Sequence, residues 1–205
     1  QPGWVDAVQL PIYDDVDAMW EDFQAGRLDC SQVPVEQLPA VTASPGAAGD
    51  GRTAGSWPAA AVYLVGINMT DPTLGASLDL RKALSQSAAA QAVVDEVGLG
   101  VDEVAGGYVP PGIPGYKDAQ NPYPYDPEGA AALVTTMGGA PTLNYWYAVS
   151  DDHRRIGETL AAGWAGAGLK VKPSGYEWGT FLEKLSRGDK GSGSQLFRIA
   201  WIADY

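Results

Sequence analysis

The sequence predicts an α/β protein whose helices cover a mixed β-sheet. From Ala59 onward, segments with a strand pattern and segments with a helix pattern follow one another in the order strand, helix, helix, strand, helix, strand, helix, strand. That alternation is typical of a sheet whose strands are joined by helices. Hydrophobic residues make up 45% and charged residues 19% of the 205 residues, a composition typical of a globule with a buried core.

The first 45 residues predict a strand–helix–strand unit. Residues 7–13 and 28–33 have strand patterns, and residues 14–25 between them have a helix pattern that Gly26 ends. The helix has one apolar face, made of Val16, Met19, Trp20 and Phe23. Such a unit places two parallel strands side by side. Pro34 then opens a short helical turn.

Residues 46–58 are rich in glycine and proline, so we expect them to form a linker to a second domain over residues 59–205. This domain opens with the apolar run 59–68, which predicts a strand that is buried on both faces at the centre of the sheet. Ser77 is expected to cap a single helix that extends over residues 78–97.

Caps, glycine stops and apolar runs predict the remaining elements. Residues 98–125 are rich in proline, glycine and tyrosine and predict a long loop that is functional or held by its own packing. Asp126 with Pro127 predicts the start of one helix, and Ser150 predicts the start of another that Gly168 ends. The last helix is expected at residues 176–187, and strands are expected at residues 143–149, 169–172 and 196–202.

Charge excludes several classes of partner. The net charge is −12 and the isoelectric point is about 4.3, so the chain repels nucleic-acid phosphates and anionic membrane surfaces. No stretch approaches the roughly 18 apolar residues that span a bilayer. We therefore expect neither nucleic-acid binding nor a membrane-spanning segment.

Cysteine and histidine are scarce. Cys30 is the single cysteine, which excludes an intrachain disulfide and a CxxC redox pair. It is interpreted as a small buried apolar residue. His153 is the single histidine and is expected at the surface, at a helix start. A histidine-rich metal site is excluded, although carboxylates alone can hold calcium.

Signals for catalysis are weak. Neither GxGxxG nor GxxxxGK[ST] follows a predicted strand, which argues against nucleotide binding. A serine hydrolase needs a nucleophile elbow and a histidine base, and the position of His153 does not favour that role. The acidic groups at residues 14–17 and 151–152 could pose as paired carboxylates, but acidic residues at helix starts usually interact with the helix dipole.

Four residues near predicted strand ends are candidates for ligand binding. Two indoles, a guanidinium and a carboxylate suit a polar ligand, and they are Trp178, Trp201, Arg198 and Asp204. The alternative is that both tryptophans fill the core, while the arginine and the aspartate form a structural ion pair.

Several blocks along the chain resemble, in order, motifs of the extracytoplasmic solute-binding proteins of peptide and nickel ABC transporters, family 5. The blocks are FQAGRLD (23–29), YLVGIN (63–68), LRKAL (80–84), VPPG (109–112), YDPE (125–128), GLKV (168–171), EWGTFL (177–182) and WIADY (201–205). The resemblance implies a truncated, periplasmic-binding-protein-like lobe of type II. Residues 1–45 would be the remnant of the first lobe, and residues 59–205 would be an incomplete C-terminal lobe.

The resemblance also implies roles for individual residues. Asp204 matches the acidic residue that pairs with the α-ammonium group of a peptide ligand. Trp201 and Trp178 match tryptophans that line the cleft, and Arg198 matches an arginine that pairs with ligand carboxylates. Asn68 is assigned to the hinge region between the lobes.

These likenesses predict the substrate-binding component of an ABC importer, which binds oligopeptides or dipeptides in an interlobe cleft and delivers them to the permease subunits. It is expected to be a monomer without cofactor, bound metal or enzymatic activity. Its expected location is extracytoplasmic, with a lipid anchor on the full-length protein. Two alternatives stay open: the same fold with an oligosaccharide, nickel chelate, haem or opine as ligand, and a carboxylate-based glycoside hydrolase.

Overall fold

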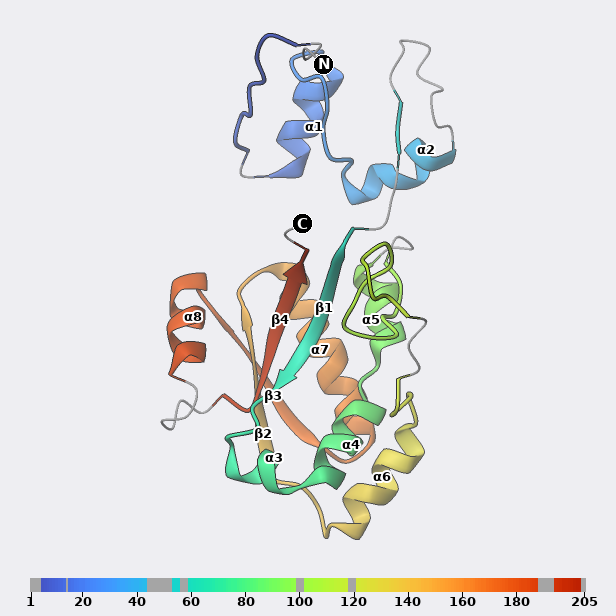
Figure 1. Cartoon of the computed structure of the whole chain (residues 1–205), viewed down its shortest axis with the longest axis vertical. Helices are drawn as coiled ribbons and strands as arrows, with labels where there is room; N and C mark the ends of the chain where they lie inside the picture. The colour runs from blue at the N-terminus through green and yellow to red at the C-terminus, as the bar shows by residue number, and fades with distance from the viewer. Residues whose placement is uncertain are drawn as a thin grey trace. The chain divides into compact units, whose positions relative to one another are not determined.

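A computed structural model describes residues 5–13, 15–43, 53–55, 59–98, 102–117, 121–187 and 194–203. The chain divides into two compact units, residues 1–57 and residues 58–205, which are drawn together in Figure 1. Of the expected linker at residues 46–58, the described part is residues 53–55.

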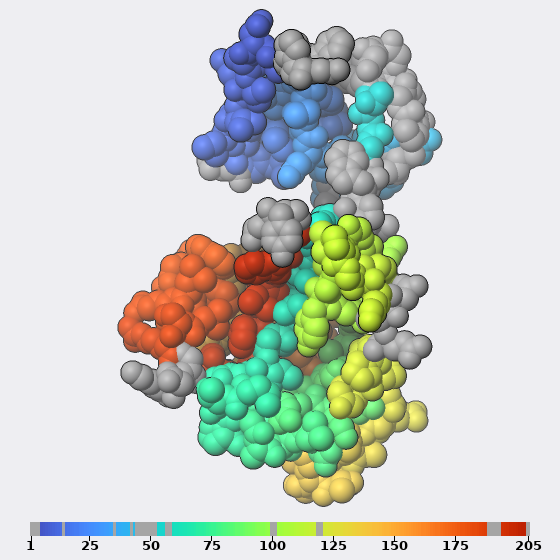
Figure 2. Space-filling model, in the orientation of Figure 1, coloured from blue at the N-terminus to red at the C-terminus, as the bar shows by residue number. Residues whose placement is uncertain are grey.

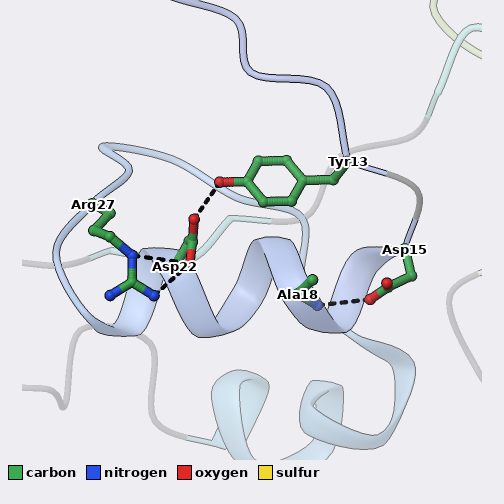
Figure 3. A network of polar contacts seen from close by, with 5 residues as sticks. All are labelled: Tyr13, Asp15, Ala18, Asp22 and Arg27. Carbon is green, nitrogen blue, oxygen red and sulfur yellow. Dashed lines mark hydrogen bonds and ion pairs between the residues drawn. The ribbon is translucent and has the colours of Figure 1, made fainter.

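The first unit contains a helix at the predicted place. Its elements are α1 (Val16–Gln24), the 3-10 turn η1 (Val35–Gln37) and α2 (Leu38–Ala43). The side chain of Asp15 accepts a hydrogen bond of 2.7 Å from the backbone N–H of Ala18, which caps α1 (Figure 3). Gly26 has a φ of +75°, in the left-handed region that ends many helices.

Asp22 connects the segments before and after α1 (Figure 3). Its carboxylate accepts a hydrogen bond of 2.6 Å from the hydroxyl of Tyr13 and bonds of 2.9 and 2.5 Å from Nε and Nη2 of Arg27. The hydrogen bonds from Arg27, followed by that from Tyr13, hold the pKa of Asp22 below its ordinary value. The Asp22 carboxylate thus ties α1 to the segments on either side of it.

The two strands expected in the first unit do not form. Residues 7–13 and 28–33 are not assigned to a strand, and Val8, Leu10 and Ile12 are exposed by 74%, 85% and 96%. A strand exists only where its backbone pairs with a neighbour, and an apolar pattern alone supplies no such neighbour. The predicted strand–helix–strand unit is therefore wrong.

The second unit is built on one mixed, four-stranded sheet, as predicted. Its strands are β1 (Ala61–Ile67), β2 (Thr142–Ala148), β3 (Lys170–Tyr176) and β4 (Leu196–Ile202), in the spatial order β1-β4-β2-β3 (Figure 1). β2 runs parallel to β3 and to β4, whereas β1 runs antiparallel to β4. β1 is thus an edge strand and only half-buried, so its predicted central position is wrong. β4 lies between β1 and β2 instead.

The described part of the second unit contains six helices, and three of them begin where the sequence predicts a cap. They are α3 (Pro72–Ala76), α4 (Leu78–Gln86), α5 (Ala90–Val97), α6 (Pro127–Thr136), α7 (Asp151–Gly166) and α8 (Trp178–Ser186). The side chains of Ser77, Asp126 and Ser150 accept backbone N–H groups at the starts of α4, α6 and α7. α3 was not predicted; Asp71 caps it by accepting from Thr73 and Leu74.

The single helix expected over residues 78–97 is broken after Gln86, where three groups outside α4 bond to carbonyl oxygens of its last turn. The indole of Trp164 donates to the carbonyl of Leu84 at 2.9 Å, and the backbone N–H of Asp126 donates to the carbonyl of Gln86 at 2.8 Å. The hydroxyl of buried Ser87 donates to the carbonyl of Ala83 at 2.6 Å. α4 therefore ends and α5 starts a new helix.

The sheet has a core on each face. The larger core contains α4, α6 and α7, and from the sheet it contains Leu143, Tyr145, Tyr147 and Leu196; we call this the α7 face. The smaller core contains Phe181 and Leu185 of α8, and from the sheet Trp146, Ala148, Tyr176 and Phe197; we call this the α8 face. Neighbouring residues along a strand alternate between the two faces. None of the helices in the described part of the chain is long and apolar enough to cross a membrane.

Candidate ligand-binding site

Three strands end at the same edge of the sheet. β2, β3 and β4 are mutually parallel, so their last residues Ala148, Tyr176 and Ile202 lie at one edge, where antiparallel β1 begins. We call this the carboxyl edge; it is the edge where the β4 arrow ends in Figure 1. Ligands of open α/β sheets bind outside the carboxyl ends of the strands. A ligand site is therefore expected at this edge.

Trp178 is the first residue of α8, directly after β3. Its ring stacks on that of Phe181, with 5.9 Å between the ring centroids and 30° between the planes. Phe181 is 2% exposed, whereas Trp178 is 55% exposed. The indole thus has one face on the protein and the other open to solvent.

Trp201 lies near the end of β4 and is 63% exposed. It shares strand parity with Phe197, which packs in the core of the α8 face, so Trp201 is on the α8 face as well. Figure 2 shows atoms of α8 and of β4 at the visible surface of the second unit. The alternative in which both tryptophans fill the core is therefore wrong.

Arg198 lies on the other face of the sheet. It pairs across the ladder with Val65, and its guanidinium carbon is 5.1 Å from the centroid of the Tyr63 ring. Its Nε is shielded from solvent and has no hydrogen-bond partner among the described residues. Arg198 is thus held on the α7 face of the sheet by a cation–π contact with Tyr63.

Aromatic and imidazole groups surround this guanidinium. The hydroxyls of Tyr63 and Tyr145 are 3.4 Å apart, and the ring centroids of Tyr63 and His153 are 6.0 Å apart. His153 Nδ1 lies 2.7 Å from the carbonyl oxygen of Ala148; because a carbonyl only accepts, Nδ1 donates. His153 is half-buried, in contrast to the surface position expected for it.

Burial dominates the ionisation of these groups. It raises the pKa of Tyr63 and of fully buried Tyr145, because the phenolate form would lose its solvation. Burial also lowers the pKa of His153, and the nearby Arg198 charge lowers it further. At neutral pH the cluster therefore holds one positive charge, on Arg198.

The structure brings two of the four predicted binding residues to one face and separates the third. Trp178 and Trp201 share the α8 face, whereas Arg198 lies on the α7 face, four residues before the end of β4. Asp204 lies outside the described residues, two positions after the last residue of β4. The convergence of all four on one ligand stays a prediction.

Asn68, assigned to a hinge, follows the last residue of β1, at the end opposite to the carboxyl edge. Its Nδ2 donates to the carbonyl of Ser194 at 2.8 Å, and its Oδ1 accepts from the backbone N–H and the hydroxyl of Thr70 at 3.0 and 2.8 Å. The boundary between the two units falls between residues 57 and 58, before β1 starts. The hinge role stays a prediction.

Sequence reasoning missed the partners of Arg198. Strand alternation alone separates Arg198 from Trp201, since they are three residues apart on one strand. Tyr63 could not be found in this way, because it is 135 positions from Arg198 in the sequence and only the register between β1 and β4 brings the two together. Cys30, interpreted as a buried residue, is exposed; it belongs to the first unit, whose core is small.

Two hollows in the described surface lie elsewhere. One of about 370 Å³ is lined by residues at the far ends of β1 and β4, including Ile67, Asn68 and Phe197. The other, of about 280 Å³, lies in the first unit beside Tyr13 and Met19. Within the described ranges, no group of three histidine, cysteine or acidic side chains is placed to hold a metal ion.

Comparison with known proteins gives three informative relatives. The chain is 30% identical over 132 residues to the dipeptide-binding protein of Escherichia coli K12, covering 61% of this chain and 24% of the relative. It is 28% identical over 195 residues to the oligopeptide-binding protein OppA of Bacillus subtilis 168, covering 89% and 34%. It is 30% identical over 125 residues to heme-binding protein A of Haemophilus influenzae, covering 57% and 23%. The chain thus spans about a quarter to a third of the length of these relatives.

Solved structures share the fold. HbpA2 of Haemophilus parasuis superposes with a TM-score of 0.75 at 23% identity, over 94% of this chain and 38% of that one. DppA of Helicobacter pylori, solved with the peptide STSA, superposes with a TM-score of 0.71 at 18% identity, over 94% and 36%. The model of the middle part of the bacterial extracellular solute-binding proteins, family 5, matches residues 1–205. This chain therefore belongs to family 5 of the bacterial extracellular solute-binding proteins.

Proposed function

We propose that this chain is the ligand-binding part of a substrate-binding component of an ABC importer, and that its ligands are short peptides. Membership of family 5 supports a role in transport, and two relatives are named for binding dipeptides and oligopeptides. The observation that carries the proposal is the pair of solvent-exposed tryptophans, Trp178 and Trp201, at the carboxyl edge. Exposed apolar surface that gathers at one place is typical of binding sites.

The chemistry of the edge suits peptides of varied sequence. Indole faces accept many side chains, and they lose little rotamer freedom on binding because tryptophan has two side-chain torsions. The end of a strand offers backbone groups to an extended main chain. The ligand would therefore be selected for its backbone and termini more than for its side chains.

The ligand's termini would meet two charged side chains. We assign Asp204, three residues after Trp201, to the α-ammonium group of the peptide, because an enclosed carboxylate is stable when a cation meets it. Arg198 would supply positive charge from the α7 face to a ligand carboxylate that reaches past the end of β4. Arg198 suits this role because no carboxylate within the described residues pairs with its guanidinium.

The transport role implies the remaining features. The complete protein would act outside the cytoplasm, carry a lipid anchor, close around the ligand as a monomer and present the closed form to the permease subunits. No reaction is part of this role, because family 5 proteins are binding proteins of transport systems.

A second candidate ligand is haem, because one relative at 30% identity is named a heme-binding protein. Haem would either stack on the exposed indoles of the α8 face or meet His153 on the α7 face, where the imidazole could act as an iron ligand. The Nδ1 of His153 is already engaged with Ala148, which leaves Nε2 for such a contact. Haem is readily distinguished from peptides by its Soret absorbance.

The test is to express the product of the complete open reading frame that contains these residues and to identify the ligands that co-purify with it. Native and then denaturing mass spectrometry would reveal a ladder of short peptides if the proposal holds. A haem band, an oligosaccharide series or a single non-peptide species would overturn the peptide assignment while leaving the transport role. Turnover of chromogenic glycosides that disappears when a pair of carboxylates is removed would overturn both the peptide assignment and the transport role.

A further inference from the structure

A lysine on α8 lies over two aromatic rings of the sheet. The ammonium Nζ of Lys184 is 4.7 Å from the centroid of the Trp146 ring and 4.6 Å from that of Tyr176. These rings come from neighbouring parallel strands and meet edge to face, 5.3 Å apart at an angle of 72°. Both distances are within the roughly 6 Å range of cation–π attraction. Lys184 is half-buried, and Trp146 is 5% exposed.

The helix geometry places Lys184 and Trp178 on either side of Phe181. Successive residues of an α-helix are about 100° apart, so Trp178 and Lys184 are each about 60° around the helix from Phe181, in opposite directions. Phe181 is the buried centre of the inner face of α8. Lys184 therefore contacts the sheet on one flank of the helix, and Trp178 extends from the other flank.

This arrangement restricts rotation of α8 about its own axis. The apolar contacts of Phe181 and Leu185 with the core are not directional, so they resist rolling of the helix over the sheet only weakly. A cation attracted to the faces of two rings has a preferred position, and it holds the flank opposite to Trp178. The orientation of α8 also sets the orientation of the Trp178 ring, because that ring stacks on Phe181.

We propose that Lys184 is a positioning residue for the ligand site: its contact with Trp146 and Tyr176 fixes the rotation of α8 and thereby aims the indole of Trp178 at the carboxyl edge. The effect on ligand binding rests on the proposed function. The effect on Trp178 does not, because it is a property of the ligand-free chain.

The first test observes Trp178 directly. The 205-residue chain is labelled with 5-fluorotryptophan, and the ¹⁹F resonance of Trp178 among the seven tryptophans is assigned with Trp178→Phe. We expect Lys184→Met, which keeps the length of the side chain but removes its charge, to shift or split this resonance by more than its linewidth. Lys184→Arg, which keeps a cation over the rings, should restore the resonance. Lys172→Met, an exposed site on β3, is the matched control and should leave it unchanged.

The second test measures peptide affinity in the product of the complete open reading frame. We expect Lys184→Met to weaken peptide binding roughly threefold to tenfold, the range of one cation–π contact, and Lys184→Arg to restore it. An unmoved Trp178 resonance in Lys184→Met, with or without a loss of stability, overturns the positioning role. A moved resonance with unchanged affinity overturns its link to the ligand. If the unmodified protein binds no peptide, the proposed function fails, while the fluorine result still decides the contact.

Discussion

Arg198 and Trp201 stand on opposite faces of β4, although they are three residues apart in the sequence. Arg198 is on the α7 face, with its guanidinium carbon 5.1 Å from the centroid of the Tyr63 ring on β1, and Trp201 is exposed on the α8 face. A ligand at the carboxyl edge would therefore meet an indole surface on one side of the sheet and a positive charge on the other. This division leads to predictions that need no ligand.

The charge of Arg198 should be visible at His153. Because the guanidinium disfavours protonation of the imidazole, Arg198→Met is expected to raise the pKa of His153. Trp201→Ala, on the other face, should leave this pKa unchanged. NMR titration gives the answer without ambiguity, because the chain has a single histidine. A shift in Trp201→Ala equal to that in Arg198→Met would contradict the placement of the two residues.

The same histidine should make stability depend on pH. Burial lowers the pKa of His153 below its ordinary value of 6.5, so between the two values the unfolded chain binds more protons than the folded one. The free energy of unfolding should therefore rise with pH through this window. The contribution of His153 to stability is lost as the pH falls from 6.5 through the lower pKa of the folded state. Urea unfolding followed between about pH 5 and 8 measures it. His153→Asn, which can still donate to Ala148, should flatten this part of the profile. An equally steep profile in this variant would show that another group causes the pH dependence.

Two glycines of α7 should respond in opposite ways to the same substitution. A Cβ on Gly163 would lie 2.7 Å from the backbone carbonyl oxygen of Ser87, at the break between α4 and α5, whereas a Cβ on Gly166 would meet nothing within 4 Å. Gly163→Ala should lower the free energy of unfolding by about 1–3 kcal/mol through overpacking. Gly166→Ala should be neutral or raise it by up to about 1 kcal/mol through helix propensity. Equal effects in chemical denaturation would contradict this packing of α7.

In the first unit, the pKa of Asp22 should depend on Arg27. Arg27→Met should raise that pKa toward its ordinary value, because the hydrogen bonds from the guanidinium are the largest cause of its lowering. A carboxyl group with a lowered pKa adds stability above its ordinary pKa of 3.8, and that stability is lost as the pH falls through the folded value. Carbon-detected NMR of the Asp22 carboxyl, with exposed Asp17 as internal control, measures the change. An unchanged Asp22 titration in Arg27→Met would contradict the contact in Figure 3.

Local signals in the sequence predicted most of the second unit. Ser77, Asp126 and Ser150 cap helices because a cap needs only the following three residues. The break after Gln86 was missed because it depends on Trp164, 80 positions from its partner Leu84. The edge position of β1 was missed for a similar reason: an apolar run shows that a strand is buried, but not which strands flank it.

For the candidate site the sequence supplied candidates whose role in binding stays a prediction. Family motifs pointed to Trp178 and Trp201, and the structure leaves both indoles half-open at one face. The surroundings of Arg198 depend on the register of β1 against β4. The cation–π contacts of Lys184 depend on the rings that β2 and β3 bring together. Neither is encoded in a local pattern. Pairing between distant segments therefore accounts for most of what was missed.

The most direct measurement is the affinity of a short peptide for the product of the complete open reading frame, compared between Trp201→Ala and Tyr125→Ala by isothermal titration calorimetry. Tyr125 is 59% exposed and serves as the aromatic control, because its neighbour Asp126 bonds to the end of α4 beside the contact of Trp164. Trp164 lies at the end of α7 that leads to the start of β3, opposite to the carboxyl edge. If the carboxyl edge binds the ligand, Trp201→Ala should weaken binding by about tenfold or more, as expected for a central aromatic contact, and Tyr125→Ala should leave it unchanged. Tight peptide binding that survives Trp201→Ala would contradict the assignment of the ligand site to this edge.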